Sequence, residues 1–431
     1  MRARTPGRRV LIPALALALL SPALGGCGRD TGAAEGELTV LGPWTDQERV
    51  DFERELVQFE QESGISVDYQ GTTATREVLL AGVQSGDPPD IAILPGLGDL
   101  AEYAAQGQLQ PLEDIVELED SFGDPWLARP DDGRGDGPDH RYWVPVKVDL
   151  KSIVWFEASR GVPEAPTDPS QWCLGMLSDA TTGWPGTDWI EDILLQRSGP
   201  AAYDAWATGA LSWTAEPVLG AWRTFGSFLA SDPSGRAAEE ALLTDHRGRD
   251  DGSGGLLLAP GHGCSLEHQG SFARSFYSGE EAARLDFVPS AEVLPGAEGT
   301  GRAREVAGDF AAMFRQSEEA EALMRYLAAG DTQAARAGHE QRPVFSAHNA
   351  VGPAAYRGEV SERLAQELRD AETLCLDASD VMPPTIGHVF SEKVIEFLAD
   401  PGRDPAVLLG DIQRVQDELP EGTAWLEQAC N

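Results

Sequence analysis

Residues 37–69, ELTVLGPWTDQERVDFERELVQFEQESGISVDY, contain the pattern of a strand, a helix and a second strand in succession. The apolar run 38–41 predicts a short strand, and residues 45–48 (Thr-Asp-Gln-Glu) form a capping-box pattern at the start of a helix. Apolar residues at helical spacing mark the buried face of this helix: Phe52, Leu56 and Phe59. Gly64 ends the helix, and the alternation in 65–69 predicts the second strand.

The same pattern continues and completes a βαβαβ unit. A second helix stops at Gly86, the turn 87–90 leads into a buried strand at 91–94, and a third helix begins near Asp99. Short connections of this kind predict an α/β fold with a parallel sheet and right-handed crossovers. Binding residues in such a sheet lie on loops beyond the carboxyl ends of its strands. The candidates there are Trp44, Asp46 and Gly96. The alternatives are a hydrophobic plug for Trp44 and a helix cap for Asp46.

The composition argues against nucleic acid and anionic lipid as partners of this chain. Its 431 residues carry a formal net charge of -38, with 71 Asp and Glu against 33 Lys and Arg. An acidic surface of this kind repels nucleic acid and anionic lipid, so we expect neither as a partner. Two of the few lysines, Lys147 and Lys151, fall within one five-residue segment. The length indicates two domains or one large two-lobed unit.

The first residues predict export and lipid attachment. Four arginines precede an apolar run, 10–20, that is too short to span a bilayer. Residues 24–27, Leu-Gly-Gly-Cys, resemble a lipobox, so we expect a signal peptide at 1–26, acylation of Cys27 and a flexible tether at 27–36. The protein is then held at the outer face of the bacterial cytoplasmic membrane and contacts the membrane only through its anchor. The alternative is an ordinary secretory signal with a chance cysteine.

Residues 181–192, TTGWPGTDWIED, place two tryptophans beside three acids at the start of an amphipathic helix. The glycines and the proline predict a turn, after which Thr187 or Asp188 caps a helix that Ile190 opens. Indole rings stack on the apolar faces of sugar rings, and carboxylates accept hydrogen bonds from hydroxyls. Trp184, Asp188 and Trp189 are therefore candidate sugar-binding residues. The alternative is that both tryptophans fill the space under a loop.

The segment 172–192 resembles the signature block of family 1 extracellular solute-binding proteins of carbohydrate ABC importers, in their α-glucoside-type branch. Further segments resemble the same family: SGDPPDIA at 85–92, GQLQPL at 107–112, PVKVDLKSIVW at 145–155 and DASDVMPP at 377–384. The resemblance covers nearly the whole mature chain. It departs at Gly308, a single glycine where the family has a run before Asp309, and at 346–349, a looser match.

This resemblance implies a two-lobed, periplasmic-binding-protein-like fold of class II, with a hinge of crossing segments. Each lobe is expected to be a mainly parallel sheet flanked by helices. The implied lobes are 37–147 with 303–346, and 148–302 with 347–431. Further implied ligand contacts are Asp149, Glu267, His268, Gln269, Asp309 and Phe390. For Asp149, an ion pair with Lys147 or Lys151 is the structural alternative.

If Cys27 takes lipid, four cysteines remain, and in an oxidising compartment they allow three pairings. Because two of them lie in blocks that carry cysteines in the related proteins, we expect the pairs Cys173–Cys264 and Cys375–Cys430. Free buried thiols are the alternative. His262 and His268 lie on either side of Cys264, but their spacing fits no common zinc pattern, so we expect no metal site and no cofactor.

The chain contains no GxSxG, HExxH or P-loop motif, so we expect a binding protein and not an enzyme. The resemblance implies capture of a sugar, an α-linked di- or oligosaccharide, by closure of the lobes and its delivery to the permease subunits of an ABC importer. We expect a monomer. One alternative is a secreted, lipid-anchored glycoside hydrolase. Another is a receptor lipoprotein that presents sugar to a sensor.

Overall fold

The computed structural model describes residues 37–131, 140–163, 166–248, 254–259, 263–297, 301–340 and 342–431. Residues 36–431 form one compact unit. The expected signal peptide, the lipidated Cys27, the tether and His262 lie outside the described residues. None of the helices within the described ranges is long and apolar enough to cross a membrane.

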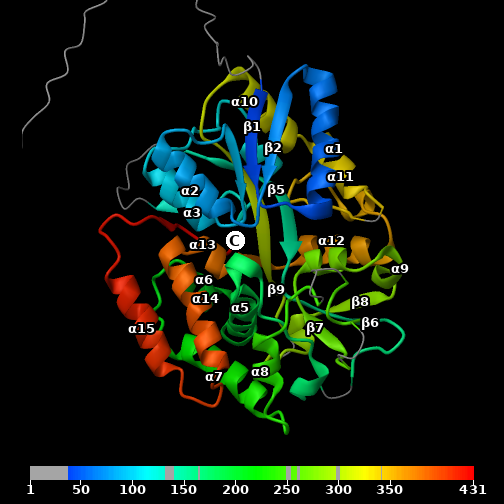
Figure 1. The fold of residues 1–431 in the computed structure, drawn as a ribbon, viewed down its shortest axis with the longest axis vertical. Coiled ribbons are helices and arrows are strands. Elements are labelled where there is room, and N and C mark those ends of the chain that lie inside the picture. Colours follow the sequence, from blue (N-terminus) through cyan, green and yellow to red (C-terminus); the bar gives the residue numbers. More distant parts are fainter. Residues whose placement is uncertain are drawn as a thin grey trace, which may run out of the picture. The chain divides into compact units, whose positions relative to one another are not determined.

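A six-stranded sheet forms the centre of the first lobe and continues into the second (Figure 1). Its strands follow the order β10 (Thr373–Leu376), β9 (Ala303–Met313), β3 (Ile91–Leu94), β1 (Glu37–Gly42) and β2 (Ser66–Gly71), and β5 (Trp143–Leu150) also pairs with β9. The strands β2 and β3 run parallel to β1 on either side of it. The βαβαβ prediction is therefore confirmed.

The strand β9 connects the two lobes. Its first residues, 303–306, pair in parallel with β10, and its last residues, 310–313, pair antiparallel with β3. The strand β5 runs antiparallel to β9, with Lys147 opposite Asp309. Two paired strands therefore pass from one lobe to the other, and charged side chains lie at the junction.

Helices flank the sheet of the first lobe. In the described part of the chain these are α1 (Asp46–Ser63), α2 (Thr75–Ser85), α3 (Leu97–Ala105), α4 (Leu118–Ser121), α10 (Glu318–Ala328) and α11 (Gly330–Ala337). As expected, α1 ends at Gly64, which has a left-handed backbone with a φ of 76°. The expected capping box is wrong, since the Thr45 side chain makes no capping hydrogen bond. The Glu48 carboxylate binds Lys147 instead.

The second lobe contains a three-stranded sheet in the order β7 (Leu266–His268), β6 (Ile153–Glu157) and β8 (Leu285–Pro289). Both outer strands run antiparallel to β6, whereas the sequence led us to expect a mainly parallel sheet. The chain between β6 and β7 forms a group of helices in which α5 (Trp184–Ser198) contacts both α6 (Pro200–Ala207) and α7 (Glu216–Ala230). Because β7 runs antiparallel to β6, these helices are not crossovers between parallel strands.

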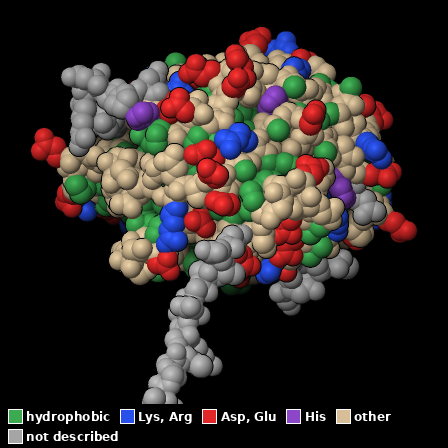
Figure 2. All heavy atoms as spheres, turned by 90° about the horizontal axis from the view of Figure 1, so that it is seen from above, with side chains coloured by type: hydrophobic (Ala, Val, Ile, Leu, Met, Phe, Trp, Pro, Cys, Tyr) green, Lys and Arg blue, Asp and Glu red, His purple; other side chains and the backbone are tan. Residues whose placement is uncertain are grey.

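The remaining elements complete this lobe. They are α8 (Ala237–Leu242), α9 (Gly279–Ala282), α12 (Glu359–Asp370), α13 (Ala378–Val381), α14 (Pro384–Leu398) and α15 (Ala406–Asp417). A short antiparallel pair joins β4 (Pro130–Asp131), in the sequence of the first lobe, to β11 (Trp425–Leu426). The disulfides Cys173–Cys264 and Cys375–Cys430 are both formed, which confirms the expected pairing. Acidic side chains are spread over the face shown in Figure 2, in keeping with the net charge.

Candidate ligand-binding cleft

A pocket of about 690 Å³ lies where the two lobes meet. The first lobe lines it with α1 and α11, and the second lobe lines it with α12 and the 3-10 helix Ser271–Phe276. Between them, β5 contributes Lys147 and Asp149. An aromatic side chain from each lobe, Trp44 and Phe272, also lines the pocket. Its volume lies within the usual range for small-molecule sites.

Lys147 is the centre of an ion-pair cluster at this pocket. Its Nζ lies 2.9 Å from Glu48 Oε1, 3.6 Å from Asp149 Oδ2 and 3.9 Å from Asp309 Oδ2. Burial lowers the pKa of this ammonium, but the three carboxylates raise it by more, so the net shift is well upward. Lys147 is therefore a charged hydrogen-bond donor at the junction of the crossing strands.

Hydrogen bonds fix two of these carboxylates. The Trp44 indole Nε1 donates to Asp309 Oδ2 at 2.8 Å, and the Ser271 hydroxyl donates to Asp149 Oδ1 at 2.6 Å. Burial raises the pKa of Asp309 to about 6, although Lys147 and the Trp44 hydrogen bond oppose this shift. Carboxylate oxygens can each accept more than one hydrogen bond, so the cluster is suited to a ligand rich in hydroxyl groups.

A second ion-pair cluster, around Lys151, lies beside the pocket. The Lys151 Nζ lies 2.7 Å from Asp188 Oδ2 and 2.9 Å from Asp377 Oδ2. The same ammonium is 5.0 Å from the centroid of the Trp184 ring and 5.7 Å from that of Phe272. At these distances a cation attracts the face of an aromatic ring. The cluster therefore supports the ring of Phe272, which lines the pocket.

Comparison with known proteins identifies the family. A model of the family described as bacterial extracellular solute-binding protein matches residues 45–241. The osmoprotective compounds-binding protein GgtB of Synechocystis sp. is 30% identical over 401 residues, which cover 88% of this chain and 92% of that protein. The chain belongs to the bacterial extracellular solute-binding proteins.

Other members and structures agree with this assignment. The alpha-glucosides-binding periplasmic protein AglE of Rhizobium meliloti is 30% identical over 416 residues, which cover 89% of this solute-binding protein and 87% of AglE. The solved structure of the solute receptor AcbH has a TM-score of 0.70 at 16% identity, and a chitin oligosaccharide binding protein has 0.69 at 17%. Both cover 89% of this chain and 98% of their own. The expected two-lobed fold is confirmed.

Five of the predicted contact residues lie at or beside the pocket of this solute-binding protein. Trp44 and Asp149 line it, and Asp309 is bound to Trp44. Trp184 and Asp188 lie in the Lys151 cluster. They share one face of α5 because they are four residues apart. This helix begins at Trp184, not at Ile190 as expected, and Gly183 precedes it with a φ of 112°.

Asp46 and Gly96 follow β1 and β3 as predicted, but neither is among the residues that line the pocket. Asp46 is the exposed first residue of α1 and has a left-handed φ of 49°. Gly96 is buried before α3, and a Cβ there would lie 2.8 Å from Asp99 Oδ2. A larger residue at this position would displace the Asp99 carboxylate.

The side chains of Trp189 and Phe390 point into the interior of the second lobe. Trp189 is 2% exposed and stacks on the rings of Phe225 and Phe228. It follows Asp188 by one residue, and one residue turns the side-chain direction by about 100° around a helix, here toward the core. Phe390 is fully buried and packs edge-on against two tryptophans. Neither side chain is among the residues that line the pocket.

Glu267, His268 and Gln269 also form their contacts inside the second lobe. The Glu267 carboxylate accepts hydrogen bonds from the Tyr277 hydroxyl and the Gln269 amide. The His268 Nε2 lies 2.9 Å from Asp192 Oδ2. All three residues are buried, and burial raises the pKa of Glu267 to about 7. These residues hold β7 to its surroundings, and they too are not among the residues that line the pocket.

The pocket also contains residues that the sequence did not single out. Among them are Glu48, Ser271, Phe272, Arg274 and Arg336. The sequence pattern places Glu48 in a helix cap, and it gives no signal for Phe272. The one useful signal in the sequence was the scarcity of lysine, because two of the few lysines, Lys147 and Lys151, are the centres of the two clusters.

Proposed function

We propose that this solute-binding protein captures a sugar between its lobes, an α-linked di- or oligosaccharide, and delivers it to the permease of an ABC importer. The observation that carries the proposal is the pocket at the junction of the lobes. There, the partly buried ring of Phe272 lies beside charged groups that suit hydroxyls, and the mostly buried Trp44 holds the carboxylate of Asp309. Aromatic faces stack on sugar rings, and charged acceptors and donors bind the hydroxyl groups.

The relatives support a sugar as the class of ligand. AglE is an alpha-glucosides-binding protein, and AcbH has an exclusive preference for β-D-galactopyranose. The GacH receptor of Streptomyces glaucescens, with a TM-score of 0.63 at 13% identity, binds acarbose. AglE supports the α-linkage. Its name specifies α-glucosides, and its sequence matches most of this chain.

Movement of the lobes about β5 and β9 is the proposed mechanism of capture. The moving bodies are residues 37–147 with 303–346, and residues 148–302 with 347–431. The Lys147 cluster lies on the strands that join them, so a bound sugar contacts the hinge and both lobes at once. A ligand shifts the protein toward the closed form only by the difference between its affinities for the closed and open forms.

The proposed place of action is the outer face of the bacterial cytoplasmic membrane. Acylation of Cys27 provides the anchor, residues 27–36 provide the tether, and the compact unit from residue 36 onward binds sugar as a monomer. The family, whose description is extracellular, supports export of this chain.

A thermal-shift screen of residues 36–431 against saccharides, followed by analysis of each recovered ligand, tests this function. A ligand that binds only the folded state at about 100 times its dissociation constant stabilises it by about 2.7 kcal/mol. We expect maltose-type or other α-glucosides to raise the melting temperature and to be recovered intact, with β-linked cellobiose as the linkage control. Recovery of cleaved sugar would support a hydrolase instead, and the absence of any shift would refute the sugar proposal.

A further inference from the structure

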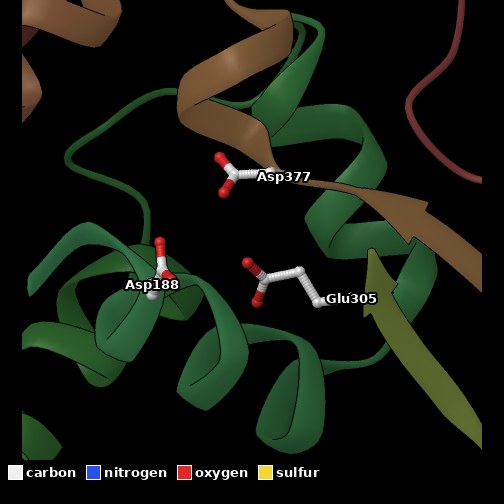
Figure 3. Close-up of side chains that lie close together, drawn as sticks. All are labelled: Asp188, Glu305 and Asp377. Atoms are coloured by element: carbon white, nitrogen blue, oxygen red, sulfur yellow. The ribbon is translucent and has the colours of Figure 1, made fainter. Parts of the chain in front are cut away.

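A group of acidic side chains is buried around Lys151, where the crossing strand β9 meets α5 of the second lobe. Asp188, Glu305 and Asp377 are 2%, 0% and 3% exposed, and one oxygen of each lies within 4.8 Å of the others. They come from three separate elements: α5, β9 and the residue that caps α13. Figure 3 shows their three carboxyl groups pointing toward a common space.

The hydrogen bonds of this group are incomplete. Lys151 Nζ binds Oδ2 of both aspartates, and Asp377 Oδ1 accepts from the Ser379 hydroxyl. Among the described residues, no hydrogen-bond donor contacts Asp188 Oδ1 or either carboxylate oxygen of Glu305. A buried polar group without a partner loses the hydrogen bonds it made to water, and the cost is greater if the group is charged. The fully buried Glu305 therefore needs a partner that the described protein groups do not supply.

The charges point to a positive partner. Three carboxylates surround the single ammonium of Lys151, and a fourth buried acid, Glu191, is hydrogen-bonded to Asp377. Burial makes an excess of like charge costly. All the available ligand atoms are carboxylate oxygens, which hard cations such as Ca²⁺ prefer. Two oxygens on one Ca²⁺, each at about 2.3–2.6 Å, lie at most about 5 Å apart, which is compatible with the observed spacing.

We propose that Asp188, Glu305 and Asp377 bind a divalent cation of the Ca²⁺ type. Asp188 Oδ1 and the two oxygens of Glu305 supply free ligand atoms, while Lys151 retains the other oxygen of Asp188. Asp377, whose two oxygens already bind Lys151 and Ser379, shares one of them with the ion. The ion joins the crossing strand β9 to α5 and to the start of α13. It therefore stabilises the base of the cleft, and this role does not depend on which solute the cleft binds.

Calcium binding by residues 36–431 tests the proposal. The protein is stripped with EDTA, and its melting temperature and bound calcium are then measured with and without millimolar CaCl₂ at physiological ionic strength. We expect one tightly held Ca²⁺ per chain and a higher melting temperature. Glu305→Gln is expected to remove both effects, and without calcium it is expected to melt above the wild type, because it removes one buried negative charge.

Calcium could also bind nonspecifically to the acidic surface, and Glu421→Gln is the control for this effect. It makes the same Glu-to-Gln change as Glu305→Gln, but at an exposed glutamate. This control is expected to bind calcium as the wild type does. If Glu421→Gln and Glu305→Gln reduce binding equally, only surface charge is involved and the proposal is wrong. A second result would also overturn the proposal. If calcium does not change the melting temperature of the wild type, and acidification raises that temperature, then Glu305 carries a proton and does not bind a metal. Neither result depends on sugar binding.

Discussion

Replacement of Trp189 by alanine is expected to lower the free energy of unfolding by about 3–5 kcal/mol, the usual range for a fully buried tryptophan. The ring is 2% exposed and stacks on Phe225 and Phe228. Its removal leaves a cavity between α5 and α7, because the surrounding side chains can relax only partly. Urea or guanidinium denaturation of residues 36–431 measures the change.

Trp184→Ala is the matched control, since it removes the same side chain five positions earlier on the same helix. Trp184 is only partly buried, although its indole donates to the Ser178 hydroxyl at 2.8 Å. We expect its loss to cost less than half as much as the loss of Trp189. Equal costs would contradict the difference in burial between the two rings. Wild-type stability for Trp189→Ala together with lost sugar binding would restore Trp189 as a ligand contact.

Lys147→Met is expected to destabilise the protein by about 3 kcal/mol or more at neutral pH, because it leaves buried carboxylates without their counter-ion. The Asp149 and Asp309 side chains are only 9% and 12% exposed, and both lie within 4 Å of the ammonium. Lys393→Met is the control: Lys393 forms a similar pair with Glu396 at 2.7 Å, but that acid is 45% exposed. Exposed pairs contribute about 1 kcal/mol or less.

The cost of Lys147→Met should also depend on pH. Asp309 has a pKa of about 6 in the folded protein and an ordinary value of 3.8, so the folded state binds its proton more tightly. Its contribution to stability therefore falls as pH rises from about 4 to about 6. Without Lys147 the ionised form loses its attraction, and the fall becomes larger. We therefore expect Lys147→Met to lose more unfolding free energy, relative to the wild type, at a pH of about 8 than at a pH of about 5. A deficit that is constant with pH, or equal to that of Lys393→Met, would contradict the buried cluster.

The first lobe could be predicted from sequence because its signals are local. Each strand and helix between 37 and 105 has its own apolar period and its own glycine or proline stop. The disulfides and the two-lobed arrangement followed from resemblance. The antiparallel sheet of the second lobe did not, because β6 pairs with β7 and β8, which lie far from it in the sequence, and such long-range pairing leaves no local signal.

The contact residues were harder to predict for a geometric reason. Trp184 and Trp189 have similar neighbours in the sequence, so the sequence does not distinguish them. The position at which α5 begins decides which of the two faces the core. Glu48 has the sequence position of a helix cap, yet it binds a lysine 99 residues away. The Asp188, Glu305 and Asp377 group has no motif spacing at all, because three distant segments supply it.

The central claim is that solute binds in the pocket between the lobes, and calorimetric titration of Phe272→Ala with the saccharide found in the screen tests it most directly. Phe272 lines the pocket and is only partly buried, so its loss should affect binding more than folding. Phe276→Ala is the control, since Phe276 lies on the same 3-10 helix, is also partly buried and does not line the pocket. We expect Phe272→Ala to weaken binding at least about fivefold, or about 1 kcal/mol, with Phe276→Ala unchanged. Wild-type affinity in Phe272→Ala would contradict the claim.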